Sequence, residues 1–381
     1  MKLATNIFYI VFFFILILFG GGFAALMLLF SGWGFLIPLL IAVMVILNIV
    51  QIFFFFEIKK RVYIYWVVGI GLAVSSFFVI PNAYDKTIAT VDDHSGSLLE
   101  DYEPFKEGTK AVKLSEPSTY KIETALPRVD GATALYPIYA AFAQSVYPEG
   151  EYPSYNSTVM SNRTGEAYMN LINGQVDMIF ALAPSKSQLK LAERHGVELI
   201  LTPIVKESFV FFVNEKNPVN NLTTQQLKDI YSGKTTNWAS VGGKSPEIRA
   251  FQRPEDSGSQ TALQAFMGET PIMDAPVSNT PSLMGGIIEE VAAYKNYKNA
   301  IGYTFRFYST EMVANDQIKL LSVDGVEPTK DTIRSGEYPI VQEFYAITAG
   351  SNNPHLQDFI DWILSPQGQE IVEKTGYVPI M

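Results

Sequence analysis

The chain has 381 residues and carries 38 Asp and Glu against 28 Lys and Arg, with three His and no Cys. A net charge of −10 without a basic stripe speaks against nucleic-acid binding, because a phosphate backbone needs clustered cations. A chain without Cys has no thiolate metal site, thiol catalysis or disulfide. The three scattered histidines, His94, His195 and His355, form no ligand-spaced pair. We therefore expect neither a metal nor another cofactor.

The N-terminal part is strongly apolar. From residue 7 to residue 56 the sequence holds no charged side chain, which rules out a single soluble globule. Three apolar runs, 7–30, 35–56 and about 62–80, each reach the roughly 20 residues that an α-helix needs to cross about 30 Å of hydrocarbon. The first run is too long for a signal peptide, and two more runs follow it. The sequence thus predicts a membrane anchor of three transmembrane α-helices over residues 1–81.

Basic residues indicate the orientation of this anchor. Lys2 and the cluster Lys59-Lys60-Arg61 favour the cytoplasmic side, where loops rich in Lys and Arg are retained. With three spans in the plasma membrane, the N-terminus is expected in the cytoplasm and everything after residue 81 outside. The runs contain no charged residue. We interpret them as a tether rather than a transport pathway, with contact to a permease partner left open.

Beyond the anchor, residues 82–124 are polar and predict a linker. From residue 125 onward, short apolar runs alternate with amphipathic segments. The predicted strands are 176–182, 198–205, 209–213, 249–252, 300–304 and 344–347. The predicted helices are 134–147, 165–173, 186–195, 224–232, 260–266, 287–294 and 356–364. This alternation is typical of an α/β fold with largely parallel strands, and its length suits two lobes.

Three segments in this part combine small or hydroxyl residues with a helix start. The first is the turn 129–137 with Thr133 as its N-cap, the second is the hydroxyl- and Gly-containing run 161–167 with Arg163 beside it, and the third joins Arg253 to Ser257, Gly258 and Ser259. Unpaired amide hydrogens at helix N-termini suit anions, and Arg can hold two oxygens of an oxyanion at once. Each start alone is usually an ordinary cap. Together they predict a cradle for a small tetrahedral anion between two lobes.

Several landmarks give this external part a family resemblance. They are Gly131-Ala132-Thr133 with Tyr136-Pro137, the run 227–238 (LKDIYSGKTTNW) with Val241-Gly242-Gly243, Arg253 with Ser257-Gly258-Ser259, Ala300-Ile301-Gly302-Tyr303, and the ending 374–379 (KTGYVP). In this order they resemble the phosphate-binding subunit of bacterial phosphate ABC importers, a type II periplasmic solute-binding protein. The resemblance covers residues 125–381 and does not extend to the membrane spans.

The resemblance implies a two-lobed type II periplasmic-binding-protein fold with a two-stranded hinge. Lobe 1 would comprise 125–206 plus 340–381, and lobe 2 would comprise 207–339. The anion would be held by Thr133, the amide of Ala134, Thr164, Arg253, Ser257, Gly258 and Ser259. Phosphate is the first ligand that the resemblance implies, with other oxyanions open, and ABC permease subunits are the implied partners.

One departure from the family concerns selectivity. Where the family reads Gly-Ala-Ser-Asp-Ala-Pro, residues 179–184 read IFALAP, so that Leu182 replaces a carboxylate that accepts a proton from hydrogen phosphate. Such an acceptor disfavours a fully deprotonated anion such as sulfate. We therefore expect weakened or altered discrimination between phosphate and sulfate, with Glu255 or Asp256 as an alternative acceptor.

The sequence thus predicts a membrane-anchored extracytoplasmic solute-binding protein that captures a small anion, phosphate first, by hinge closure. A ligand sensor or adaptor that signals through membrane partners is the alternative, because sensing and uptake share one site. A hydrolase with Ser257 or Ser259 as nucleophile is disfavoured, since no His or Lys base lies nearby in the sequence. We expect no catalysis.

Overall fold

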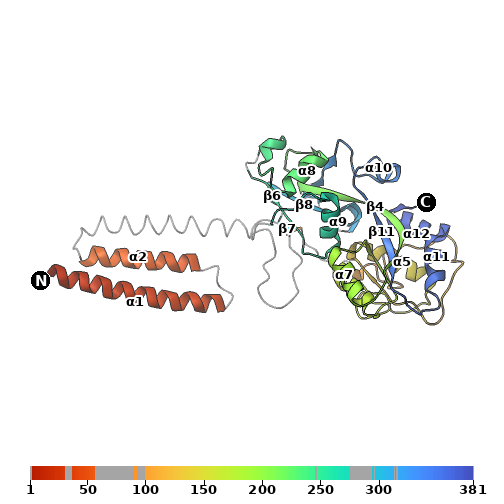
Figure 1. Cartoon of the computed structure of the whole chain (residues 1–381), viewed down its shortest axis with the longest axis horizontal. Coiled ribbons are helices and arrows are strands. Elements are labelled where there is room, and N and C mark those ends of the chain that lie inside the picture. Colours follow the sequence, from red (N-terminus) through yellow and green to blue (C-terminus); the bar gives the residue numbers. More distant parts are fainter. Residues whose placement is uncertain are drawn as a thin grey trace. The chain divides into compact units, whose positions relative to one another are not determined.

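The computed structural model describes residues 2–30, 37–55, 90–91, 99–244, 247–274, 294–295, 297–312, 314 and 316–380 (Figure 1). The chain divides into two compact units, Met1–Ala89 and Thr90–Met381. Each unit is described by itself.

The N-terminal unit contains two long helices, α1 (Lys2–Phe30) and α2 (Ile37–Phe55). They pack closely where Gly21 of α1 meets Met44 of α2, because a Cβ at Gly21 would overlap the Met44 side chain. Most apolar side chains of α1 are exposed, including Phe8 and Phe19 at 66% and 78%. A helix covered with exposed aromatic and aliphatic groups is suited to lipid rather than water.

The prediction of three transmembrane helices is supported in part. Within the described residues, one helix, Ile7–Leu26, is long and apolar enough to span a membrane by length and composition. The second predicted run forms helix α2 but is not among such candidates. The third predicted run, 62–80, lies outside the described residues.

The C-terminal unit is built on a mixed eight-stranded sheet. The main strand order is β2 (Val129–Gly131), β3 (Met178–Leu182), β11 (Val341–Thr348), β4 (Ile200–Asn214), β8 (Ala300–Phe305) and β6 (Arg249–Ala250), while β12 (Val378–Pro379) and β9 (Ile318–Leu320) pair with β4. The first half of β4 pairs with β11 as far as Ser208, and the second half pairs with β8 from Phe209. The sheet therefore has two halves joined by β4. We call the half with β2, β3 and β11 lobe 1, and the half with β8 and β6 lobe 2.

Strand β4 corrects two predictions. The strands expected at 198–205 and 209–213 are one continuous strand of 15 residues. The expectation of largely parallel pairing is also wrong, because β4 runs antiparallel to β11, β8, β9 and β12, and β11 runs antiparallel to β3. Parallel pairs remain at β2–β3 and β6–β8, and in the small sheet of β5 (Asn221–Leu222) with β10 (Ser322–Val323). A second small sheet pairs β1 (Thr90–Val91) with β7 (Tyr294–Lys295).

The helices of this unit follow the predicted segments closely. They are α5 (Tyr136–Val146), α6 (Arg163–Ile172), α7 (Lys186–Arg194), α8 (Thr224–Tyr231), α9 (Gly258–Met267) and α11 (Leu356–Leu364). Reciprocal capping boxes open α7 at Ser185 and α8 at Thr223, directly before the first residues of the two predicted helices. Helices α10 (Lys330–Ser335) and α12 (Pro366–Thr375) were not predicted. The helix expected at 287–294 falls on undescribed residues, apart from Tyr294 in β7.

The expected linker at 82–124 is shorter than its polar composition indicates. Leu99, Ala111 and Ile122 are buried in the core of the C-terminal unit. The amide of Ser115 donates to Glu370 Oε1 of α12 at 2.9 Å, and Lys374 Nζ donates to the carbonyl of Lys113 at 3.0 Å. Residues from 99 onward therefore belong to the folded unit.

Candidate functional site

The first predicted helix start follows directly from strand β2. Thr133–Leu135 forms a short 3-10 turn that leads into α5, with Ala132 in an extended cap position. A Cβ at Gly131 would lie 2.5 Å from the carbonyl oxygen of Phe180, and the amide of Ala132 donates to that same oxygen at 2.9 Å. Only glycine allows β2 to approach β3 this closely. Thr133 and Ala134 lie half-buried at the end of the strand.

Asp130, a residue that the sequence analysis missed, ties the first helix start to the second. Its carboxylate is fully buried and accepts four hydrogen bonds. Oδ1 accepts from the amides of Gly131 and Asn162, both at 2.7 Å, and Oδ2 accepts from the side-chain amides of Asn162 at 2.9 Å and Asn170 at 2.8 Å. A buried charge is tolerated when its lone pairs are satisfied in this way. No strand was predicted at 129–131, so nothing in the sequence marked Asp130 as buried.

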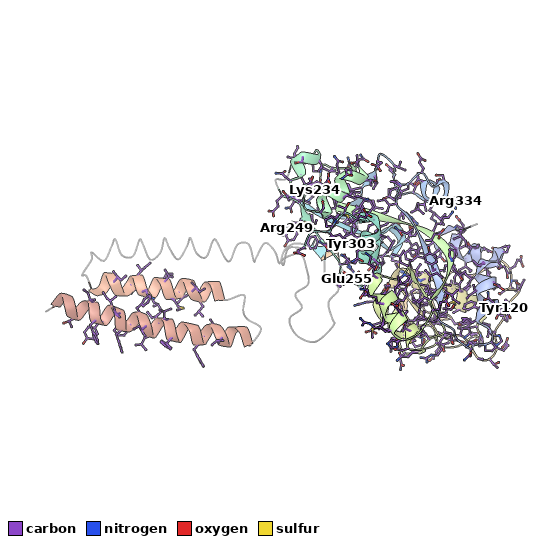
Figure 2. All side chains as sticks on the ribbon, in the orientation of Figure 1. Tyr120, Lys234, Arg249, Glu255, Tyr303 and Arg334 are labelled. Carbon is purple, nitrogen blue, oxygen red and sulfur yellow. The ribbon has the colours of Figure 1, made fainter. Side chains whose placement is uncertain are left out.

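The third predicted helix start lies between β6 and α9. Ser257 is the N-cap of α9, and its hydroxyl accepts from the amide of Gln260 at 3.2 Å. The amide of Arg253 donates to the Tyr303 hydroxyl at 2.8 Å and to Gln260 Oε1 at 3.1 Å. These hydrogen bonds fix the backbone of the turn between β6 and α9. Figure 2 labels Glu255 in this turn and Tyr303 on β8. Tyr303 is 4% exposed, and burial raises the pKa of its hydroxyl, so it is a neutral partner.

The second and third helix starts come together across the two lobes. A Cβ at Gly258 would lie 3.0 Å from Thr164 Oγ1, and a Cβ at Gly165 would lie 3.9 Å from the carbonyl oxygen of Asp256. Thr164 opens α6 in lobe 1, whereas Gly258 opens α9 in lobe 2. The N-termini of two helices, one from each lobe, therefore face a common region. Aligned amides at two helix N-termini favour a negatively charged group between them.

Leu182 lies in the core. It is 3% exposed, pairs with Phe344 of β11, and its carbonyl accepts from the Tyr168 hydroxyl at 2.6 Å. Of the two alternative acceptors, Glu255 is exposed, and its carboxylate accepts from Gln264 Nε2 of the following helix α9 at 2.9 and 3.0 Å. Asp256 is bonded to lobe 1 instead.

The C-terminal segment contacts the first helix start. The hydroxyl of Tyr377 donates to the carbonyl oxygen of Ala134, and the Tyr377 ring stacks on Phe307 of lobe 2 with centroids 4.2 Å apart. Gly376, in the left-handed region at φ 111°, accepts from Arg306 at 2.7 Å through its carbonyl. Gly376 and Tyr377 thus connect the first helix start with Arg306 and Phe307, which directly follow β8.

A separate pocket of about 410 Å³ lies at the other end of the β3–β11 pair and is lined by Leu171, Asp177 and Ser351 among others. The Asp177 carboxylate accepts from the amide of Arg128 at 2.7 Å and from the Ser351 hydroxyl. The negative charge of Asp177 would repel an anion, so we do not interpret this pocket as a second anion-binding site. Among the described residues, no group of three or more His, Asp or Glu could hold a metal ion.

Comparison with known proteins identifies the family of the C-terminal unit. A family model described as a PBP superfamily domain matches residues 118–367. The chain is similar to the phosphate-binding protein PstS of Bacillus subtilis, with 25% identity over 258 residues, which is 66% of this chain and 80% of that protein. It is 26% identical over 261 residues to PstS of Staphylococcus saprophyticus, covering 66% of this chain and 79% of that protein. A solved ABC-type phosphate transport receptor from Vibrio cholerae aligns over 68% of this chain and 99% of its own, with 18% identity and a TM-score of 0.44.

Proposed function

The chain belongs to the PBP superfamily, and we propose that it is a membrane-anchored extracytoplasmic solute-binding protein that captures phosphate for an ABC importer. The observation that carries the proposal is the approach of Thr164 in lobe 1 to Gly258 in lobe 2, which aims two helix N-termini at one region. The curated relatives named as phosphate-binding proteins support phosphate as the ligand. Capture without catalysis accounts for these features.

In the proposed site the anion lies between the three helix starts. Its donors are the hydroxyls of Thr133 and Thr164, the amide of Ala134, the Arg253 guanidinium, and the Ser257, Gly258 and Ser259 element. The Ser257 hydroxyl already accepts from the Gln260 amide, so its own hydrogen is directed to a ligand rather than to α9. A bidentate arginine adds charge and fixes the orientation of the anion.

The proposed anchor has three spans, of which Ile7–Leu26 has the required length and composition in the described part of the chain. The N-terminus lies in the cytoplasm, and the binding unit is held on the outer face of the plasma membrane beside permease subunits. A fixed anchor keeps the binding unit at a high effective concentration near its permease. The proposed lobe boundaries are 125–206 plus 340–381 for lobe 1 and 207–339 for lobe 2.

The test is calorimetric titration of the detergent-solubilised full chain with phosphate, together with Arg253→Ala. The parent should bind, and the variant should weaken binding well over tenfold, because losing one partner of a desolvated charged pair costs about 2–5 kcal/mol. Arg249→Ala is the matched control, since Arg249 lies on β6 and stacks on the Tyr297 ring at 4.1 Å. Equal binding by Arg253→Ala and the parent would contradict the proposed site. A parent that binds no anion would favour the sensor or adaptor alternative.

A further inference from the structure

Asp256 adopts an unusual backbone conformation in the turn before α9. Its φ of 64° lies in the left-handed region, which residues with a Cβ adopt at some cost, although Asp tolerates it better than most. Glycine would occupy the same position without strain. A non-glycine residue persists in such a conformation when surrounding contacts hold it there. The contacts that hold Asp256 come from the other lobe.

The carboxylate of Asp256 is bonded to the N-terminus of α7. Oδ1 accepts from the hydroxyl of Ser185 at 2.6 Å and from the hydroxyl of Ser187, and the Asp256 carbonyl accepts from Gln188 Nε2 at 3.4 Å. Ser185 is the N-cap of α7 and accepts from the Gln188 amide, so its hydroxyl hydrogen is available to Asp256. A carboxylate at a helix N-terminus also interacts favourably with the helix dipole.

These contacts cross from one lobe to the other. Helix α7 connects β3 to β4 within lobe 1, whereas Asp256 follows β6 in lobe 2. They lie beside the approach of Thr164 to Gly258, because Asp256 and Gly258 belong to one short turn. The same turn thus carries both the groups proposed to donate hydrogen bonds to the anion and a carboxylate that is hydrogen-bonded to the opposite lobe.

We infer that Asp256 is a positioning residue that latches lobe 2 onto the N-terminus of α7 and so stabilises the closed arrangement of the lobes around the anion. The inference rests on the proposed function, in which hinge closure captures phosphate. The apparent affinity of a hinged protein is its intrinsic affinity multiplied by the fraction of molecules in the competent form. A latch between the lobes raises that fraction and slows release of the bound anion.

Glu255 provides a matched comparison. It is the neighbouring acidic residue in the same turn, yet among the described contacts its carboxylate accepts only from Gln264 of α9, within lobe 2. Both residues contribute one negative charge near the proposed site. A general electrostatic effect on an anion would therefore appear at both positions, whereas a latch acts at Asp256 alone.

The test measures phosphate affinity and the phosphate dissociation rate of the full chain in detergent. Asp256→Gly removes the carboxylate while suiting the left-handed backbone, so the turn keeps its shape. We expect binding to weaken about tenfold, mainly through faster dissociation, since charge-assisted hydrogen bonds across a partly exposed interface are lost. Ser187→Ala should shift both quantities in the same direction by a smaller factor, and Glu255→Gln should match the parent.

A distance measurement separates a latch from a merely structural role. The chain has no Cys, so spin labels can be placed at Glu193→Cys on α7 and Gln225→Cys on α8. Without phosphate, Asp256→Gly should shift the label distances to longer values than in the parent, and saturating phosphate should restore the parent distribution. If the parent binds phosphate but Asp256→Gly matches Glu255→Gln in dissociation rate and label distances, the latch is refuted. If the parent itself binds no phosphate, the proposed function fails instead.

Discussion

Glu207 Oε1 and Arg306 Nε lie 3.8 Å apart in a buried ion pair where β4 passes from lobe 1 to lobe 2. The Glu207 carboxylate also accepts from the amides of Ser208 at 2.7 Å and Phe307 at 3.1 Å. Arg306 donates onward to the carbonyl of Gly376 and also faces Glu311 at 3.6 Å. The pair therefore joins the crossing strand, the end of β8 and the C-terminal segment.

This ion pair predicts a pH dependence of stability. Burial raises the pKa of Glu207 from 4.5 to about 7, against the opposing effect of Arg306 and of the amides that donate to it. The folded state then binds more protons than the unfolded state between these values. The stability that Glu207 contributes is therefore complete below pH 4.5 and is lost as the pH rises through about 7.

Glu207→Gln should remove this dependence, at a constant cost in stability because its single side-chain oxygen can accept from only one of the two amides, which donate to different carboxylate oxygens. Over the whole interval, parent and variant should diverge by up to about 3 kcal/mol, at roughly 1.4 kcal/mol per unit of pKa shift. Thermal unfolding of both chains from pH 5 to pH 8 measures the difference. Parallel curves would contradict a raised pKa at Glu207.

Asp130→Asn should both destabilise the chain and weaken phosphate binding. The new NH2 group faces N–H donors, so at least one of the four hydrogen bonds is replaced by an unfavourable contact that costs about 1–3 kcal/mol. The first and second helix starts lose their common anchor, and we expect phosphate binding to weaken about tenfold, or roughly 1.4 kcal/mol.

Asp177→Asn is the control for Asp130. Asp177 also accepts a backbone amide, that of Arg128, but it lies in the separate pocket of lobe 1. Thermal unfolding should reveal a loss of stability in both variants. Calorimetry with phosphate should distinguish them, and an unchanged affinity in Asp130→Asn would show that the carboxylate does not position the site.

The parent chain should discriminate weakly between phosphate and sulfate. By the family resemblance, Leu182 would stand where the family has a carboxylate, and Asp256 Oδ1 already accepts from two serine hydroxyls. A protonated phosphate oxygen then finds a hydroxyl acceptor at best, which yields less than a charged one. Parallel titrations with phosphate and sulfate measure the ratio of affinities. Strong selectivity for phosphate would mean that another acidic residue supplies the acceptor.

Leu182→Asp should mainly cost stability. Leu182 is 3% exposed and packs in the core, so a carboxylate introduced there would be buried. Burying a carboxylate at this position should destabilise the chain by several kcal/mol, about the penalty for an unpaired buried charged group. Thermal unfolding of Leu182→Asp measures this loss, and a stable variant with sharpened phosphate selectivity would place Leu182 at the ligand instead.

The topology of the anchor is testable on intact cells. Lys2 and the Lys59–Arg61 cluster predict that the N-terminus and that loop are cytoplasmic, with the C-terminal unit outside. Protease added to intact spheroplasts should therefore degrade the C-terminal unit. A tag at the N-terminus should be digested only after the membrane is permeabilised. Protection of the C-terminal unit would overturn the predicted orientation.

The sequence by itself determined the features that depend on nearby residues. Uniform apolarity over Ile7–Leu26 marked a helix able to span a membrane, because hydrocarbon length sets the length of such a run. The predicted helices at 186 and 224 begin where α7 and α8 begin, because a helix start depends on residues nearby in the sequence: the caps Ser185 and Thr223 bond amides only three positions away. The helix starts proposed to bind the anion were found for the same reason.

Only the tertiary structure decided the features that join distant residues. Alternation of strands and helices did not reveal that β4 serves both lobes with antiparallel neighbours, because strand direction depends on which strands meet. The polar composition of the segment from residue 99 predicted a linker, but its few apolar residues pack in the core. The sequence offered Asp256 only as an alternative proton acceptor, yet its partner Ser185 is 71 positions away. No local pattern encodes such a pair, because its members belong to different lobes and meet only in the tertiary structure.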